Sequence, residues 1–247
     1  LVVGGGSSGG QIASELLDDG RPVYLALGSG PWLVRRYRGR DISGWDEASG
    51  FSAQPVQSLE GPAQRLAALP MLGVNDTGET LSPRVLHTRG VTVTGRLTGV
   101  DGNIVRFGDN LPATLAAGDG FLKFLTGRID DYIAANGVEA PAPAPESALP
   151  PWPTLTELDL ASAGVKSVVW ATGYRMDFSW ILDCEFDEQG YPAHQGGVTP
   201  ERGLYFIGLP WLTRRGSGFI KGVGYDAAAL VAHLAATPRA AELQTAR

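Results

Sequence analysis

Along this chain, short runs of apolar residues alternate with segments whose apolar residues recur at helical spacing. Runs rich in β-branched residues predict buried parallel strands over residues 1–3, 22–27, 90–94 and 165–170. Apolar positions at helical spacing predict helices over residues 11–19, 118–136 and 227–236, with Gly137 ending the second. Because strands alternate with helices, the pattern is typical of an α/β fold with a Rossmann-like parallel sheet.

A turn signal separates two further runs of alternating polarity. Residues 97–100 and 104–107 flank Asp101-Gly102-Asn103, which predicts a β-hairpin in an antiparallel layer against the parallel sheet. Other patterns predict a short helix over residues 63–69, a Pro/Ala-rich loop over 141–153 and a strand over 203–208.

Composition narrows the classes of protein to which the chain can belong. Of its 247 residues 43% are hydrophobic, and the mean hydropathy is -0.02, so the chain can bury a substantial core. A net charge of -6 and a pI of about 5.1 argue against a nucleic-acid partner. No apolar run reaches the length of a membrane span and no signal peptide is visible, so we expect no membrane partner.

The cysteine content and the start of the chain add two expectations. The single cysteine, Cys184, leaves no internal disulfide, which fits a reducing cytoplasm. The chain begins at Leu1 without an initiator methionine, and only three residues of the first strand precede its turn. We therefore expect a chain that lacks an N-terminal portion.

The first predicted strand runs into a glycine-rich segment with the G-x-G-x-x-G spacing at Gly4, Gly6 and Gly9. Strand, glycine turn and helix in this order form the context of a dinucleotide-binding fingerprint. Gly4 would permit the tight turn, Gly6 the approach of a pyrophosphate, and Gly9 the close packing of helix on strand. Free N–H groups at the helix start, with the hydroxyls of Ser7 and Ser8, would bind the phosphates. A flexible linker is the alternative, but linkers lack flanking strand and helix patterns.

The end of the second predicted strand indicates which dinucleotide binds. NAD sites place an acidic residue there for the ribose 2′-OH, whereas this chain has Gly28-Ser29-Gly30. Arginines follow at positions 35, 36, 38 and 40, and arginine suits bidentate phosphate contacts. We expect NADPH to be preferred over NADH by about tenfold or more, and alanine at both Arg35 and Arg36 to reduce that preference. A solvated basic loop is the alternative interpretation.

No side chain is predicted to be catalytic or to bind a metal. The three histidines lack metal-ligand spacing and a nucleophile partner, so structural or surface roles are expected for His87, His194 and His233. Acidic neighbours would raise the pKa of the Cys184 thiol and keep it unreactive. Core positions are expected for Trp170, Trp180 and Trp211.

Three segments together resemble a known family: VVGGGSSGGQIASEL, VVWATGY and GLYFIGLPWLTRRGSGFIKGVGYDAA. They are similar to the flavin-containing monooxygenase-like oxidoreductases, which bind FAD and NADPH in two dinucleotide-binding domains. The resemblance covers nearly the whole chain. It implies an NADP(H)-binding domain over residues 1–172 with a helical insertion, and the C-terminal portion of a Rossmann-like FAD-binding domain over residues 173–247. The FAD fingerprint of the family would precede residue 1.

The resemblance also implies roles for individual residues. The NADPH pyrophosphate would be held by Gly4, Gly6, Ser7, Ser8, Gly9 and Gln11. The 2′-phosphate would be approached by Ser29, Arg35 and Arg36. The crossing between the two domains would be formed by Ala171, Thr172 and Gly173. The flavin would be faced by Gly208, Gly222 and Asp226, where a helix dipole can stabilise negative charge on a reduced ring.

The chemistry implied by the resemblance is hydride transfer from NADPH to FAD, followed by oxygen activation on a small organic substrate. Two alternatives stay open: a flavin-dependent electron-transfer reductase and a non-catalytic NADP(H)-binding module. Because part of the flavin site would be missing, we expect the 247-residue chain to bind NADPH weakly and to purify without colour. We also expect it to expose apolar surface that includes some of Leu204, Phe206 and Ile207.

Overall fold

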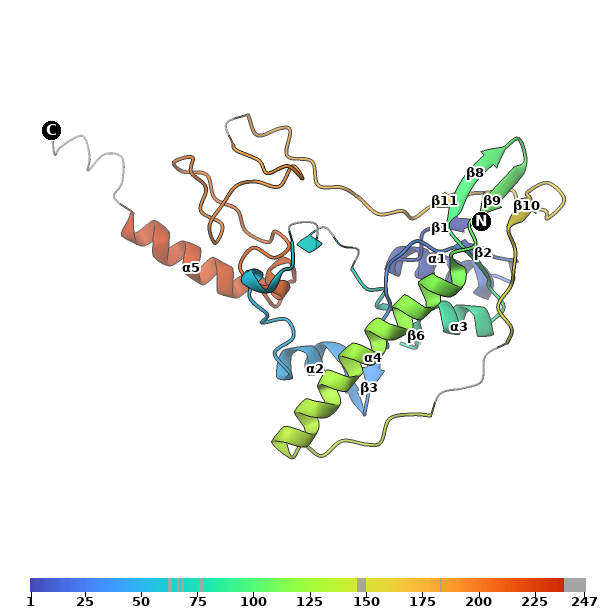
Figure 1. Cartoon of the computed structure of the whole chain (residues 1–247), viewed down its shortest axis with the longest axis horizontal. Helices are drawn as coiled ribbons and strands as arrows, with labels where there is room; N and C mark the ends of the chain where they lie inside the picture. Colours follow the sequence, from blue (N-terminus) through green and yellow to red (C-terminus); the bar gives the residue numbers. More distant parts are fainter. Residues whose placement is uncertain are drawn as a thin grey trace. The chain divides into compact units, whose positions relative to one another are not determined.

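A computed structural model describes residues 1–61, 64–65, 67, 69–75, 78–145, 150–182 and 184–237. The chain divides into two units (Figure 1). Leu1–Trp45 and Ala68–Tyr174 form the first, and Asp46–Ala67 and Arg175–Arg247 form the second. Residues 46–67, which the sequence analysis placed in the first domain, therefore group with the C-terminal unit.

A four-stranded parallel sheet is the centre of the first unit. Its strands are β1 (Val2–Val3), β2 (Tyr24–Ala26), β7 (Thr92–Thr94) and β11 (Val169–Trp170). They lie in the order β11-β1-β2-β7, and every pair is parallel. In chain order this is the 3-2-1-4 arrangement of a Rossmann half. The predicted parallel sheet, including the pairing of Val2 with Val169, is confirmed.

Alternate residues of the sheet face two different layers. Val2, Leu25 and Val93 pack in one core cluster with residues of α1 (Ser7–Asp18), α3 (Pro83–Thr88) and α4 (Leu111–Asn136). Val3 and Ala26 pack in a second cluster with Val105, Phe107 and Leu158. Because side chains alternate across a strand, one short sheet supplies both cores.

The second cluster belongs to a three-stranded antiparallel sheet of β8 (Leu97–Asp101), β9 (Ile104–Phe107) and β10 (Glu157–Asp159). The predicted hairpin is confirmed, since Val100 pairs with Val105 across it. The third strand was not predicted. Its three residues include one apolar side chain, Leu158, which is too short a pattern to indicate a strand.

Helix α4 begins seven residues before the predicted start at Gly118. Pro112 lies in its first turn, where proline is favourable. Gly118 lies inside the helix. Glycine is required at this position because a Cβ would lie 2.1 Å from the ring of Trp32, which is 1% exposed. The predicted end is confirmed, with Gly137 left-handed at φ 61°.

Two small hairpins flank the first-unit helices. One is β3 (Arg36–Tyr37) with β4 (Arg40–Asp41), and the other is β5 (Gly73–Val74) with β6 (Thr80–Leu81). Between them in the chain come α2 (Ile42–Ala48) and the 3-10 helix η1 (Val56–Ser58). The helix predicted over residues 63–69 lies largely outside the described residues. The described parts of the predicted 141–153 loop carry no helix or strand, as expected.

The second unit contains the 3-10 helix η3 (Arg215–Gly218) and α5 (Val223–Ala236) around a small core. The strand predicted over residues 203–208 is wrong: Tyr205 forms only an isolated bridge with Val198. A strand requires a ladder partner along its length, and among the described residues no such partner lies beside this segment. The described part of this unit accordingly shows no parallel sheet of its own.

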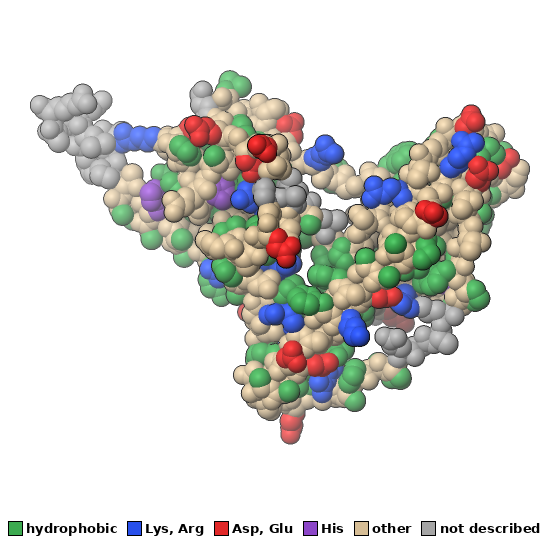
Figure 2. All heavy atoms as spheres, in the orientation of Figure 1, with side chains coloured by type: hydrophobic (Ala, Val, Ile, Leu, Met, Phe, Trp, Pro, Cys, Tyr) green, Lys and Arg blue, Asp and Glu red, His purple; other side chains and the backbone are tan. Residues whose placement is uncertain are grey.

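Large apolar side chains are exposed on the surface (Figure 2). Trp170 is 63% exposed and Trp180 is 74% exposed, so their predicted core positions are wrong, while Trp211 is half-buried. Ile207 is exposed as expected, but Phe206 is buried. None of the helices in the described ranges combines the length and apolar character needed to cross a membrane.

Candidate functional site

The candidate site lies where β1 ends and α1 begins, at the carboxyl edge of the parallel sheet. Gly6 is the N-cap of α1, so the helix starts at Ser7, four residues before the predicted start. Ligands of open α/β sheets bind at this edge, next to the point where the strand order reverses. Here that point is between β1 and β11, because β2 and β7 lie on the other side of β1.

Two glycines of the fingerprint are required by contacts within the protein. Gly4 has φ 118°, and a Cβ on it would lie 2.2 Å from the carbonyl oxygen of Ala171. A Cβ on Gly9 would lie 1.9 Å from the carbonyl oxygen of Gly4. Real Cβ atoms do not approach an oxygen so closely, so the strand, the loop and the helix can close on one another only with glycine here.

Gly6 differs from these two glycines because it faces open space. It is exposed, and a Cβ built on it meets no atom within 4 Å. No side chain caps the helix at this point, and its first turn carries no acidic residue. Among the described residues no partner accepts the N–H groups of Ser7, Ser8 or Gly9. Free donors, a helix dipole and an uncovered glycine give this loop the chemistry of an anion site.

The serines and the glutamine of the fingerprint have different surroundings. The Oγ of Ser7 accepts a hydrogen bond of 3.1 Å from the backbone N–H of Leu72. A hydroxyl that accepts in this way still has its own proton to donate. The side chains of Ser8 and Gln11 are exposed. Ser7 is therefore a positioned donor, while Ser8 and Gln11 are accessible from solvent.

A backbone strip crosses from the loop after β2 to the glycine loop. Met71 donates from its N–H to the carbonyl of Pro31 at 2.8 Å and accepts from the N–H of Leu33 at 2.9 Å. The next residue, Leu72, contacts Ser7 as described above. Residues 71–72 are thus hydrogen-bonded both to the loop after β2 and to the glycine loop, which lie at the same edge of the sheet.

The Ala171-Thr172-Gly173 segment lies against the glycine loop. Ala171 donates from its N–H to the carbonyl of Val3 at 2.8 Å, and its own carbonyl faces Gly4. Thr172 and Gly173 are exposed, and Gly173 is left-handed at φ 83°. The structure therefore brings Ala171 against Gly4 and Gly9, from which it is far apart in sequence. A role in crossing between domains stays a prediction.

Three of the four arginines that follow β2 have partners within the first unit. Arg35 forms an ion pair of 2.7 Å with Asp41, and its backbone N–H donates to Thr80. Arg38 forms an ion pair of 2.8 Å with Asp130. The guanidinium of Arg40 lies over the ring of Trp45. Arg36, on the β3–β4 hairpin, is exposed and has neither an ion pair nor a ring contact among the described residues.

The residue in contact with Ser29 is an arginine that the sequence analysis missed. The Nη2 of Arg96 donates to the Oγ of Ser29 at 3.5 Å. Arg96 follows β7, which pairs with β2. The signal that could have found it is its place two residues after the third strand, because in a 3-2-1 order that strand ends beside the second.

The residues predicted to face a flavin lie in the second unit. Gly208 is exposed, with φ 77°. Gly222 is buried, and a Cβ on it would lie 1.9 Å from the carbonyl oxygen of Gly216. Asp226 is 1% exposed, and its carboxylate accepts a hydrogen bond from the hydroxyl of Thr213. The close contact explains why residue 222 is glycine, while Oδ2 of Asp226 is buried without a hydrogen-bond partner among the described residues. The assignment of both residues to a flavin stays a prediction.

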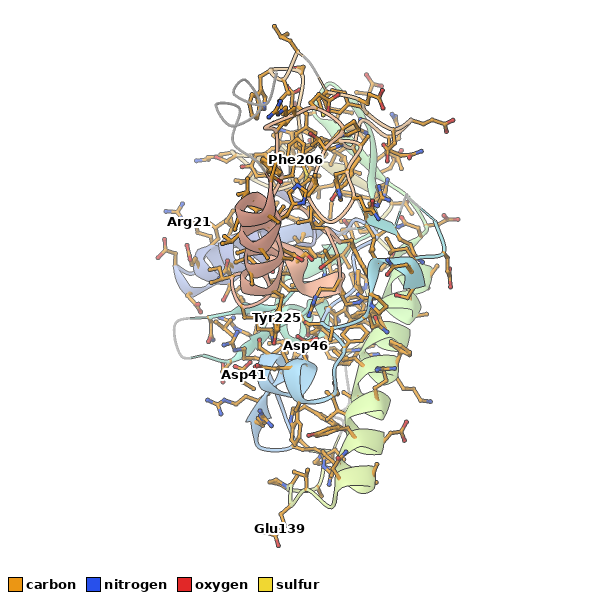
Figure 3. All side chains as sticks on the ribbon, turned by 90° about the vertical axis from the view of Figure 1, so that its left-hand side faces the viewer. Arg21, Asp41, Asp46, Glu139, Phe206 and Tyr225 are labelled. Carbon is orange, nitrogen blue, oxygen red and sulfur yellow. The ribbon has the colours of Figure 1, made fainter. Side chains whose placement is uncertain are left out.

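The start of α5 presents an aromatic side chain instead of these buried residues. Tyr225, labelled in Figure 3, is 62% exposed, and the guanidinium of Arg214 lies 4.3 Å from its ring centroid. Close by in sequence, Lys221 forms an ion pair of 3.0 Å with Asp46. The basic side chains of this segment are thus held by partners within the second unit.

The histidines and the cysteine have surroundings that match structural roles. His87 stacks on Trp152 with ring centroids 4.3 Å apart. His194 accepts at Nδ1 from the N–H of Gly197, and His233 is exposed beside Tyr205. The pKa of Cys184 is raised as expected, although burial is the main cause and Glu201 and Glu185 follow. Across the described ranges no three His, Cys, Asp or Glu side chains are grouped to hold a metal ion.

His194 predicts a pH dependence of stability. Burial first, then Arg65, lower its pKa below the ordinary value of 6.5, while Asp226 opposes them. The unfolded chain therefore takes up a proton at a higher pH than the folded chain. We expect the free energy of unfolding to fall as the pH drops below about 6.5, and the variant His194→Asn to fall less steeply. Urea denaturation between pH 5 and pH 7.5, about the range in which histidine titrates, measures both slopes.

The matched control for this prediction is His233→Asn, because His233 is an exposed histidine of the same unit. In this variant the free energy of unfolding should change with pH as steeply as in the unsubstituted protein. If the free energy of unfolding of His194→Asn changes with pH as steeply as that of the unsubstituted protein, His194 is not the cause of the pH dependence.

Comparison with known proteins shows a likeness that runs through both units. No family model matches the chain. It is 29% identical over 233 residues to a Geobacillus kaustophilus protein named uncharacterized oxidoreductase CzcO-like. It is 30% identical over 236 residues to the uncharacterized oxidoreductase CzcO of Bacillus subtilis. Each match covers 94% of this chain and 51% of the relative, so the chain spans about half the length of the curated relatives it matches. The chain is therefore similar, over nearly all of its length, to part of proteins that are named oxidoreductases.

Proposed function

We propose that the chain is the nicotinamide-dinucleotide-binding part of an oxidoreductase that takes hydride from NADPH. The observation that carries the proposal is the open surface at Gly6, on a helix start with free N–H groups at the carboxyl edge of a sheet in Rossmann order. A pyrophosphate needs both features, since its oxygens must reach backbone donors without meeting a side chain. The names of the relatives support the reaction class.

The residues present fit a dinucleotide. A Cβ built on Gly6 meets no atom within 4 Å, so the surface at this residue has room for phosphate oxygens. The N–H groups of Ser7, Ser8 and Gly9 would donate to the phosphates, and the Ser7 hydroxyl would add one positioned donor. The protein's contribution is to hold the cofactor and orient it, while NADPH supplies the hydride.

In finer detail, we propose that the acceptor of the hydride is FAD and that the complete reaction oxygenates a small organic substrate. This part rests on the resemblance to flavin-containing monooxygenase-like proteins over the segments around Gly4, Ala171 and Gly222. In a flavin-loaded preparation, oxygen consumption with NADPH distinguishes an oxygenase from a reductase that passes electrons to an added acceptor.

The variant Gly6→Ala tests the dinucleotide site. Its φ of -83° suits alanine, and the open space accepts a methyl group, so the fold should lose less than about 1 kcal/mol of stability. The methyl group would lie where the pyrophosphate approaches. We expect the Kd for NADP⁺, measured by calorimetry, to rise at least about tenfold, or about 1.4 kcal/mol.

The control is Gly127→Ala, at an exposed glycine in α4 whose Cβ also meets no atom within 4 Å. It should leave the Kd for NADP⁺ unchanged. Unchanged affinity in Gly6→Ala would show that the dinucleotide does not bind at this loop.

A further inference from the structure

The carboxyl ends of β2 and β7 lie side by side. The two strands are parallel neighbours, with Ala26 opposite Thr94 at the last paired position. Ser29 comes three residues after Ala26, and Arg96 two residues after Thr94, so both leave the sheet at the same edge. Their side chains meet there, with Arg96 Nη2 at 3.5 Å from Ser29 Oγ.

The backbone of Arg96 is anchored while its guanidinium is accessible. Its N–H donates to the Oδ1 of Asn110 at 2.9 Å, and its carbonyl accepts from the N–H of Gly108 at 2.8 Å. The neighbouring Gly95 packs so closely that a Cβ on it would lie 2.0 Å from the Gly108 carbonyl oxygen. Arg96 itself is exposed, and in the described part of the chain no carboxylate pairs with it. A positioned arginine without an acidic partner keeps its full charge and its donors for a ligand.

We propose that Arg96, together with Ser29, binds the 2′-phosphate of NADP(H) and is the residue that selects NADP(H) over NAD(H). The inference rests on the proposed function, because the adenosine ribose of a dinucleotide bound at Gly6 reaches the end of β2. A guanidinium binds the phosphate bidentately, and the Ser29 hydroxyl adds a donor once Arg96 turns to the ligand. No acidic residue follows β2 to receive the 2′-OH of NAD.

This assignment replaces Arg35 and Arg36 as the specificity residues. Arg35 already forms its ion pair with Asp41, so a phosphate there would have to displace a carboxylate at 2.7 Å. Arg36 is exposed on the β3–β4 hairpin, and no contact joins it to Ser29 in the described part of the chain. Among the arginines that the structure describes, only Arg96 combines an unpaired charge with contact to the end of β2.

Calorimetric titration of the 247-residue chain with NADP⁺ and NAD⁺ tests the inference, using the variants Arg96→Ala, Ser29→Asp and the control Arg36→Ala. Arg36→Ala removes another exposed positive charge, so it tests both general electrostatics and the earlier assignment of Arg36. We expect Arg96→Ala to raise the Kd for NADP⁺ at least about tenfold and the Kd for NAD⁺ less than about twofold. Ser29→Asp should weaken NADP⁺ through charge repulsion and favour NAD⁺ through the 2′-OH. Arg36→Ala should change neither Kd by more than about twofold.

Four results would overturn the inference, and they differ from one another. Equal weakening of both dinucleotides in Arg96→Ala would show that Arg96 supports the loop and not the 2′-phosphate. Equal effects of Arg96→Ala and Arg36→Ala would show that Arg96 is not the selecting residue, whether through a general effect of charge or because Arg36 also binds the 2′-phosphate. Equal affinity of the unsubstituted chain for NADP⁺ and NAD⁺ would remove the selectivity but keep the proposed function. Binding of neither dinucleotide would remove the proposed function itself, and this inference with it.

Discussion

Gly9→Ala is expected to lower the free energy of unfolding by about 3 kcal/mol and to abolish dinucleotide binding. The added Cβ would lie 1.9 Å from the Gly4 carbonyl oxygen, so either the helix or the loop must move. Gly4 is held in place because its N–H donates to the carbonyl of Ala26 at 2.9 Å, so a shift of the loop would cost that hydrogen bond. Alanine gains about 1 kcal/mol over glycine in a helix, which is less than the cost of the overlap.

Urea denaturation and calorimetry with NADP⁺ measure the two effects of Gly9→Ala. The matched control is Gly6→Ala, which lies on the same loop and faces open space, and which should lose affinity while keeping most of its stability. A Gly9→Ala protein as stable as the parent would show that helix α1 can withdraw from the sheet at little cost.

Gly118→Ala is expected to lower the free energy of unfolding by about 2–3 kcal/mol. The Cβ would lie 2.1 Å from the Trp32 ring, which is 1% exposed and therefore has no open space in which to turn. Closely packed interiors transmit such an overlap to their surroundings. Gly127→Ala lies in the same helix and faces open space, so it should gain about 0.5–1 kcal/mol from helix propensity alone.

A double-mutant cycle identifies the contact responsible. Trp32→Phe removes the part of the indole that the new Cβ would meet, so Gly118→Ala should cost less in that background. The free energies of unfolding of all four proteins give the coupling. A coupling free energy of zero would show that the loss of stability in Gly118→Ala does not come from the contact with Trp32.

Local signals predicted the sheet and the glycine loop. Residues 1–27 carry a strand, three spaced glycines, a helix and a second strand in one continuous stretch, and each signal can be recognised without knowing the rest of the chain. Residues 165–170 then join that sheet as expected, because the parallel order of such folds limits the choices.

Tertiary contacts decided the features that the sequence analysis missed. Gly118 lies within α4 because the ring of Trp32 packs against it and leaves no room for a Cβ. The sequence around Gly118 does not indicate this contact, so the glycine was interpreted as the start of the helix. Residues 203–208 have strand composition, but strand formation depends on a ladder partner. Arg96 was overlooked because its contact with Ser29 spans 67 positions and follows only from the order of the strands.

The strip at Met71 and Leu72 has a consequence for engineering this site by loop exchange. Its hydrogen bonds to Pro31, Leu33 and Ser7 join the loop after β2 to the glycine loop. A transplanted loop with a different backbone path after β2 would not place its carbonyl and N–H groups opposite Met71, and a shift of Met71 and Leu72 would disturb the hydrogen bond to Ser7. The loop after β2, residues 71–72 and the glycine loop are therefore coupled, so an exchange that changes cofactor preference has to carry residues 28–33 and 71–72 together and keep the position of Ser7.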